Sequence, residues 1–365
     1  MPAIGFQDIR FVRLNAEVIP VNPTEAALYR HYGITPVLVD AYEPDDIIAG
    51  VADCDALAVV SASLPEEVIR SLARCRIISR LGNGTDKIDV EAATRDGIIV
   101  SNVPTFCNDE MADHVMASLL GLARRIPAMS RHFYAGRFRK ARDEGLRLQR
   151  ISGLTLGLIG FGASAKAVVR RAKPFGLRLL ATRKNLRAPR DEADALGVRM
   201  VDLDTLLAES DFVSLHLPLT KGTYRLLNAS TLRKMKPGSF FINTCRGAIT
   251  DESALADLLR SGHLGGAAID TFDDIEIFGE QEAPPDHALA RLDNVILTPH
   301  VSGLSVQASQ DVAITGVENL LSVLGGRWPH PDNIVNAGVR PRLLLKEHEP
   351  ALFDHRKDVA LYASN

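Results

Sequence analysis

The chain has 365 residues and a formal net charge of −3; hydrophobic residues make up 46% of it and charged residues 24%. This length allows two domains of ordinary size, and the composition is typical of a globular protein. The small net charge argues against a nucleic-acid partner or an acidic membrane surface.

The sequence carries no sign of export or of membrane insertion. The N-terminus has neither the charged region nor the apolar core of a signal peptide, and no run of about 18 apolar residues occurs. The four cysteines lie far apart, without the spacing of a metal site. We therefore expect a cytoplasmic protein with reduced thiols, no bound metal and no membrane partner.

Short apolar runs alternate with helical stretches over the first hundred residues. Strands are predicted at Val37–Val39, Ala56–Val60, Ile77–Ile78 and Ile98–Val100, and helices at Pro65–Ala73 and Val90–Arg95. This alternation is typical of βαβ units around a parallel sheet.

A long amphipathic helix is expected next. Apolar residues recur with helical spacing from Asp109 to Ile126. A polar, basic stretch at residues 130–150 follows it and contains Phe133, Tyr134 and Phe138.

The alternation of strands and helices restarts at Leu154. Six strands are predicted, at Leu154–Ile159, Leu177–Ala181, Phe212–Leu215, Phe240–Ile242, Gly266–Ile269 and Val295–Leu297. The helices between them are expected at Ala165–Pro174, Leu203–Glu209, Ala229–Lys234 and Glu252–Leu259. This pattern matches a doubly wound dinucleotide domain. A further helix is predicted at residues 305–324, and residues 337–365 form an appended tail.

A glycine turn joins the first of these strands to its helix. Gly160 permits the sharp turn, and Gly162 lets the backbone approach a pyrophosphate. Ala165 stands where the dinucleotide fingerprint has its third glycine, and its small side chain lets helix and strand pack closely. The backbone N–H groups at Ala163, Ser164 and Ala165 begin the helix and can bind phosphates.

The order of segments resembles the D-isomer-specific 2-hydroxyacid dehydrogenase family between residues 80 and 336. Besides the glycine turn, the resemblance lies in the segments Leu81–Asp89, Asn102–Pro104, Glu110–His114, Leu215–Thr220, Phe241–Gly247 and Thr298–His300. It implies an α/β fold of two doubly wound parallel-sheet domains, a Rossmann-type nucleotide domain and a flavodoxin-like substrate domain. Residues 1–105 and 301–336 would form the substrate-binding domain, 106–300 the dinucleotide-binding domain and 337–365 a C-terminal tail.

Two residues at predicted strand ends are the candidate catalytic groups. His300 closely follows the last strand, where open α/β sheets place their ligands, and it can deliver a proton as hydride reaches a keto carbon. Arg246 can grip a carboxylate with its guanidinium and polarise the keto oxygen. In the family a glutamate hydrogen-bonds the histidine, but Ile275 stands at its place here. We expect Glu276 to take that role, with Glu282 as the second candidate.

The turn at Asn83 and Gly84 is the expected substrate-binding loop, together with Arg246 and His300. Its backbone N–H groups would bind the substrate carboxylate. The side chain of Asn83 would either hydrogen-bond the substrate or fold onto the turn. The loop after Val60 carries no arginine, which argues against a phosphorylated substrate.

The residues after the second strand of the dinucleotide domain bear on the choice of cofactor. A carboxylate there would bind the ribose 2′-hydroxyl of NAD. The chain has Arg183 and Lys184 instead, which pair with a 2′-phosphate, so NADP is the expected cofactor and NAD is left open. Other expected cofactor contacts are Leu217, Pro218, Thr244, Cys245, Arg246, Asp270, His300 and Gly303.

The resemblance implies an oxidoreductase that transfers hydride between NADP(H) or NAD(H) and a small D-2-hydroxy acid or 2-keto acid. It also implies a homodimer, with the helix from Asp109 and the basic stretch 130–150 at the contact. The alternative is a nucleotide-sensing, non-catalytic binding protein of the C-terminal-binding corepressor type. The displaced glutamate favours that alternative, whereas Arg246 and His300 favour an enzyme.

Overall fold

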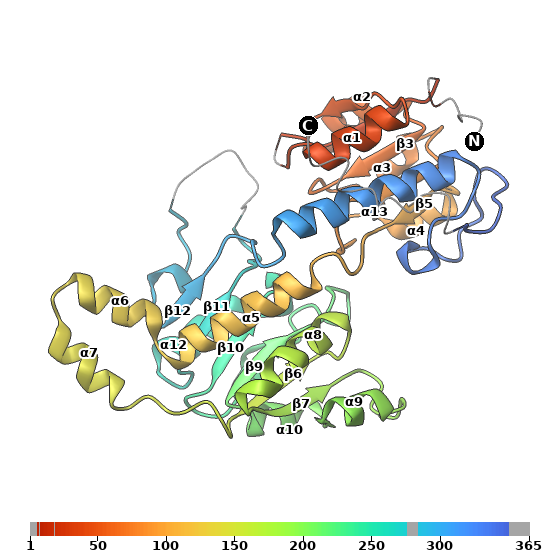
Figure 1. Ribbon diagram of the computed structural model, residues 1–365. Coiled ribbons are helices and arrows are strands. Elements are labelled where there is room, and N and C mark those ends of the chain that lie inside the picture. The colour runs from red at the N-terminus through yellow and green to blue at the C-terminus, as the bar shows by residue number, and fades with distance from the viewer. Residues whose placement is uncertain (1–5, 7, 18, 276–283, 350–365) are drawn as a thin grey trace. The chain divides into compact units, whose positions relative to one another are not determined.

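The computed structural model describes residues 6, 8–17, 19–275 and 284–349 (Figure 1). The chain divides into two compact units. The first combines Met1–Phe106 with Ser305–Asn365, and the second comprises Cys107–Leu304.

The first unit contains a five-stranded parallel sheet in the order β2-β1-β3-β4-β5. Its strands are β1 (Phe11–Leu14), β2 (Val37–Val39), β3 (Ala56–Val59), β4 (Ile77–Arg80) and β5 (Ile99–Ser101). Its helices are α1 (Pro23–His31), α2 (Pro44–Val51), α3 (Glu66–Ser71), α4 (Val90–Arg95) and α13 (Val306–Leu324). The strand order is that of a flavodoxin-like fold. Two apolar cores show that helices cover both faces: α1 and α13 pack on one, and α2, α3 and α4 on the other.

Strand β1 was not predicted, because Arg13 interrupts its apolar run. The structure explains how a cation can lie there. Arg13 is buried and its Nε is 2.9 Å from Glu25 Oε1, while its other nitrogens donate to the carbonyl oxygens of Leu14 and Ile19. A buried charge is tolerated when it is paired and hydrogen-bonded in this way.

The segment before residue 350 packs against the first unit. Arg342 donates hydrogen bonds to four backbone carbonyl oxygens, those of Leu72, Ala73, Cys75 and Asp96. Trp328 N donates to Lys346 O at 2.9 Å. The described part of the expected tail is therefore held by specific hydrogen bonds.

The second unit contains a seven-stranded parallel sheet in the order β12-β11-β10-β9-β6-β7-β8. Its strands are β6 (Thr155–Ile159), β7 (Arg178–Thr182), β8 (Val198–Met200), β9 (Phe212–Leu215), β10 (Phe240–Asn243), β11 (Gly266–Ile269) and β12 (Val295–Leu297). Its helices are α5 (Asn108–Ala123), α6 (Ile126–Tyr134), α7 (Phe138–Gly145), α8 (Ala163–Ala172), α9 (Asp191–Leu196), α10 (Leu203–Glu209), α11 (Ala229–Leu232) and α12 (Glu252–Arg260). The order extends the Rossmann arrangement by one strand.

The prediction of six strands was wrong by one. The missed strand, β8, is a three-residue edge strand in which the exposed Arg199 separates Val198 from Met200. Such a short segment has too few apolar residues for periodicity to reveal it.

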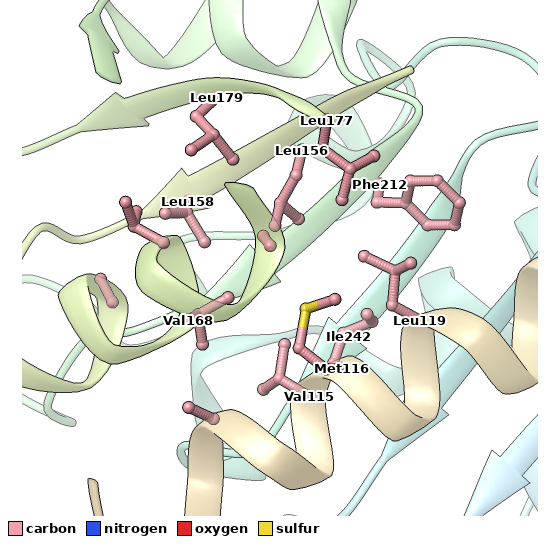
Figure 2. Packing of buried hydrophobic residues seen from close by; sticks show 14 of the residues in the cluster. Val115, Met116, Leu119, Leu156, Leu158, Val168, Leu177, Leu179, Phe212 and Ile242 are labelled. Atoms are coloured by element: carbon pink, nitrogen blue, oxygen red, sulfur yellow. The ribbon is translucent and has the colours of Figure 1, made fainter. Parts of the chain in front are cut away.

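Helix α5 and the glycine-turn helix α8 pack side by side on one face of this sheet. Figure 2 shows Val115, Met116 and Leu119 of α5 against residues of β6 and α8, such as Leu158 and Val168. The predicted helix to Ile126 ends earlier, at Ala123, because Arg125 takes a left-handed backbone conformation (φ 51°). Ile126 then begins α6, and the basic stretch forms α6 and α7.

Candidate active site

The candidate residues of the second unit follow the carboxyl ends of its strands. Because all seven strands are parallel, these ends lie at one edge of the sheet. The chain runs from β6 outward to β8, then returns to β9 on the other side of β6. Ligands of open α/β sheets bind at such a switch point. The glycine turn follows β6, Arg183 and Lys184 follow β7, Leu217 and Pro218 follow β9, Arg246 follows β10, Asp270 follows β11, and His300 and Gly303 follow β12.

The two glycines of the turn have different surroundings. Gly160 has φ +107°, and a Cβ there would lie 2.1 Å from the carbonyl oxygen of His216. Gly162 is the N-cap of α8, is exposed, and has no atom within 4 Å of where a Cβ would stand. Ala165, in the first turn of α8, is fully buried.

The N-cap residue of α8, Gly162, has no side chain that could cap the first turn of the helix. Open space lies beside this end of the helix, where a Cβ of Gly162 would stand. An uncapped helix N-terminus with room beside it suits a pyrophosphate.

Arg246 is positioned by the backbone around it. Asn243 holds the loop after β10, since its Oδ1 accepts from Cys245 N at 2.9 Å and its Nδ2 donates to Arg246 O at 2.9 Å. Gly247 packs so closely that a Cβ would lie 2.1 Å from the Phe272 carbonyl carbon. Arg246 itself is half-buried, and its Nη1 donates to Cys245 O.

The two neighbours of Arg246 in the expected cofactor set are buried. The Sγ of Cys245 donates to Leu215 O at 3.0 Å, and burial raises the pKa of this thiol to about 11. Cys245 is therefore a neutral, unreactive thiol at neutral pH. The Oγ1 of Thr244 is buried without a hydrogen-bond partner among the described residues.

His300 stands in a loop held by Asp270. The carboxylate of Asp270 accepts from Thr298 Oγ1 at 2.6 Å, and from the backbone N–H groups of Val301 and Ser302 at 3.0 Å each. His300 N donates to Asp270 O at 2.8 Å. The backbone of His300 is left-handed, with φ 55°, so the loop fixes an uncommon conformation at this residue. Asp270 thus organises the loop of the candidate acid, a task that its sequence position did not reveal.

A second carboxylate lies next to this region. Glu252 of α12 accepts from His287 Nε2 at 3.0 Å and from Asp273 N at 3.3 Å. Burial raises the pKa of Glu252 to about 7, against the opposing effect of the Asp273 hydrogen bond. The two carboxylates expected to pair with His300, Glu276 and Glu282, lie outside the described residues.

Arg183 stabilises the loop that follows β7 through hydrogen bonds within that loop. Its Nη2 donates to the carbonyl oxygens of Ala188 (2.6 Å) and Pro189 (2.7 Å). Its Nη1 makes no hydrogen bond to the described residues. Lys184 beside it is exposed. The two hydrogen bonds hold the guanidinium in place while one end of it remains available.

The expected substrate loop belongs to the first unit and follows β4. Gly82 has φ +141°, and Arg80 Nε donates to Gly84 O at 2.9 Å. Asn102 Nδ2 donates to Asn83 O at 2.7 Å, and its distance to Asn83 Oδ1 is 3.4 Å. The side chain of Asn83 is exposed and is therefore folded only weakly onto the turn.

A lysine side chain hydrogen-bonds to the loop after β3, which itself contains no arginine. Asn15 Oδ1 accepts from Ser61 N (3.3 Å) and Ala62 N (2.8 Å), which fixes this loop. Lys87 Nζ donates to Ser61 O at 3.2 Å. A cationic side chain thus lies at the carboxyl edge of the first unit's sheet, the edge at which the expected substrate loop follows β4.

The fold and the site together define a class of protein. A Rossmann-type sheet with an open glycine turn, and with an arginine and a histidine on its ligand-binding edge, is typical of nucleotide-dependent dehydrogenases.

Comparison with known proteins identifies the family. Residues 116–302 match the family model described as D-isomer specific 2-hydroxyacid dehydrogenase, NAD binding domain. The chain is 38% identical over 295 residues to a glyoxylate reductase of Korarchaeum cryptofilum, covering 80% of this chain and 86% of that protein. It is also 38% identical over 302 residues to a D-3-phosphoglycerate dehydrogenase of Synechocystis, covering 82% of this chain but only 52% of that protein.

A solved structure agrees with this family. The NADPH-dependent glyoxylate/hydroxypyruvate reductase of Sinorhizobium meliloti, in complex with NADP and malonate, matches with a TM-score of 0.76 and 27% identity. The match covers 92% of this chain and 99% of that one. The chain belongs to the D-isomer-specific 2-hydroxyacid dehydrogenase family. The predicted family, the two-domain α/β fold and the class of NAD(P)-dependent dehydrogenase are confirmed, and the comparisons give no support to the corepressor alternative.

Two classes of feature are absent from the part of the chain that the structure describes. Among the described residues, no helix is long and apolar enough to cross a membrane. Nor does that part of the chain hold a group of three or more His, Cys, Asp or Glu side chains placed to bind a metal ion.

Proposed function

We propose that this protein reduces small 2-keto acids to D-2-hydroxy acids with NADPH as the preferred hydride donor. The observation that carries the proposal is that the open glycine turn, Arg246 and His300 all stand at the carboxyl edge of one parallel sheet. The dinucleotide and the groups that act on a keto acid therefore share one binding edge.

Each residue has a distinct task in this reaction. The nicotinamide, when bound, supplies the hydride. Arg246 binds the substrate carboxylate and polarises the keto oxygen. His300 donates a proton to that oxygen, and Asp270 holds the loop that presents His300. Backbone N–H groups at Asn83 and Gly84 bind the substrate carboxylate as well.

The remaining site residues border the cofactor. The N–H groups of Ala163, Ser164 and Ala165 face the pyrophosphate beside Gly160 and Gly162. We place the following residues around the nicotinamide half: Leu217, Pro218, Thr244, Cys245, Asp270 and Gly303. All of them follow strand ends at the same edge.

A panel of substrates tests the proposal. Glyoxylate, hydroxypyruvate and longer 2-keto acids would be reduced with NADPH and with NADH, and the decrease in absorbance of the reduced nicotinamide followed. We expect turnover with at least one acid and a higher kcat/KM with NADPH. Tight NADPH binding without turnover of any acid would refute the enzymatic assignment.

The preference for NADP depends on Arg183. Replacing it with aspartate is expected to raise the Kd for NADPH by about 30-fold or more, since a cation that pairs with the 2′-phosphate becomes a repelling anion. The Kd for NADH should change by less than about threefold, because NADH has no 2′-phosphate. Both values come from fluorescence titration. Arg178→Asp, at the amino end of the same strand, is the matched control. An unchanged NADPH affinity in Arg183→Asp would show that the 2′-phosphate binds elsewhere.

We also propose a homodimer formed through α6 and α7. Their aromatic side chains are unusually exposed: 64% for Phe133, 85% for Tyr134 and 50% for Phe138. Phe133 makes ring contacts with both of the others. Exposed aromatic clusters of this kind mark protein–protein contacts.

Charging this cluster should produce monomers. Phe133→Glu combined with Tyr134→Glu is expected to convert the dimer to a monomer, because two carboxylates would be desolvated at the contact. Size-exclusion chromatography with light-scattering detection measures the molar mass. Phe175→Glu, a partly exposed aromatic residue after α8, is the control and should leave the dimer intact. A dimer that survives the double substitution would place the contact elsewhere.

Free thiols at all four cysteines support the cytoplasmic location that we propose.

A further inference from the structure

A buried histidine links the glycine turn to the neighbouring strand. His216 directly follows β9, and its Nδ1 lies 3.2 Å from the Oγ of Ser164, the second residue of α8. Its Nε2 lies 3.0 Å from the Oγ of Ser214, a fully buried residue of β9. The backbone of His216 is also tied to the start of the turn, since His216 N donates to Ile159 O at 2.8 Å and a Cβ on Gly160 would lie 2.1 Å from His216 O.

The ring of His216 is neutral at neutral pH. Burial lowers the pKa of His216 to about 4. A neutral imidazole carries one proton, so one ring nitrogen donates and the other accepts. The hydrogen-bonding needs of the two serines decide which nitrogen does which.

Ser214 determines the tautomer. Its hydroxyl is buried, and among the described residues His216 Nε2 is its only hydrogen-bond partner. A buried hydroxyl that donates to nothing costs free energy, so Ser214 donates and Nε2 accepts. The ring proton then stands on Nδ1, which donates to Ser164 Oγ.

Ser164 is left with a proton to donate. Its Oγ accepts from His216, and within the described part of the chain it has no second partner. The residue is half-buried, next to the exposed Gly162 and Ala163 at the uncapped start of α8. Its O–H is therefore available at the end of the helix where an anion would be held.

We propose that His216 is a positioning residue for the dinucleotide site, which keeps the Ser164 hydroxyl oriented as a hydrogen-bond donor to the pyrophosphate. The inference rests on the proposed function, because it requires a bound dinucleotide. It also gives Ser164 a role that its neighbour Ala163, whose side chain is a methyl group, cannot fill.

Direct binding measurements test this assignment. The ligands are NADPH, NADH and adenosine diphosphate ribose, which share the pyrophosphate; the last lacks nicotinamide and is measured by displacement of NADPH. Ser164→Ala is expected to raise the Kd of all three by about tenfold, the loss of one hydrogen bond to a charged acceptor. Ser230→Ala, in the first turn of α11, should leave each Kd unchanged.

Variants of His216 distinguish positioning from general support of the fold. His216→Gln loses the donor at Nδ1 but keeps an amide near Ser214, and should raise each Kd about tenfold. His216→Asn keeps an N–H near Ser164 and should bind within about threefold of the unaltered protein. His216→Gln should have no further effect in the Ser164→Ala background, because both changes remove one interaction.

Several outcomes would overturn the proposal. Unchanged affinity in Ser164→Ala, a loss confined to the two ligands with nicotinamide, or additive effects of the Ser164 and His216 changes would each contradict it. If the unaltered protein bound none of the three ligands, the proposed function would fail as well. Normal binding by the unaltered protein together with normal binding by Ser164→Ala would overturn only the role of the hydroxyl.

Discussion

Replacing His300 with glutamine is expected to lower kcat for 2-keto acid reduction by about 10²- to 10⁴-fold, the usual contribution of a positioned general acid. Glutamine has similar size and can still hydrogen-bond the keto oxygen, but it cannot deliver a proton to it. Because glutamine keeps the size of the side chain and a hydrogen-bonding group, the contact of this residue with the cofactor should be retained, and the Kd for NADPH should stay within about threefold. Steady-state kinetics and fluorescence titration on the same preparation give both values.

The pH dependence of the reaction adds a second measurement. Reduction needs the protonated imidazole, so the rate of the unaltered enzyme should decline toward alkaline pH, and His300→Gln should lose this dependence. The control is His263→Gln. His263 precedes β11 at the opposite edge of the sheet and is bonded to Met235 O, so its loss should leave kcat unchanged. Equal kcat in His300→Gln and the unaltered enzyme would remove His300 from the chemistry.

Much of the fold could be predicted because both sheets are parallel. Buried parallel strands are continuous apolar runs, and segments such as Leu154–Ile159 and Gly266–Ile269 were recognised on that basis. The strands that escaped prediction lack such a run. Strand β1 carries the buried Arg13, and β8 alternates around the exposed Arg199. A paired buried cation and a short edge strand leave little mark on hydrophobic periodicity.

For the site, the sequence predicts the edge of the sheet at which each residue lies, but not the contacts that its side chain makes. Because parallel strands share a carboxyl edge, sequence order alone brings the loops of Arg246, Asp270 and His300 to one side. Which partner each side chain takes depends on distances across the sheet. The three hydrogen bonds to Asp270 and the one between Ser164 and His216 join segments that no local spacing connects.

Substitutions at Gly160 and Gly162 should have different effects, the first on the stability of the fold and the second on cofactor binding. Gly160→Ala is expected to lower the free energy of unfolding by about 3 kcal/mol or more, through strain at φ +107° and a Cβ 2.1 Å from the His216 carbonyl oxygen. The neighbouring segment is backbone and cannot move aside as a flexible side chain would. Urea unfolding measures the effect.

Gly162→Ala should leave the stability of the fold nearly unchanged and weaken cofactor binding. Its backbone is extended (φ −93°, ψ −164°) and open space surrounds the new methyl group, so stability should change by less than about 1 kcal/mol. The methyl group would nevertheless stand at the start of α8, where the pyrophosphate must approach the backbone. We therefore expect the Kd for NADPH to rise by about tenfold or more in a protein of normal stability. Normal affinity in Gly162→Ala would mean that the dinucleotide does not reach this turn, and would weaken the assignment of the whole edge.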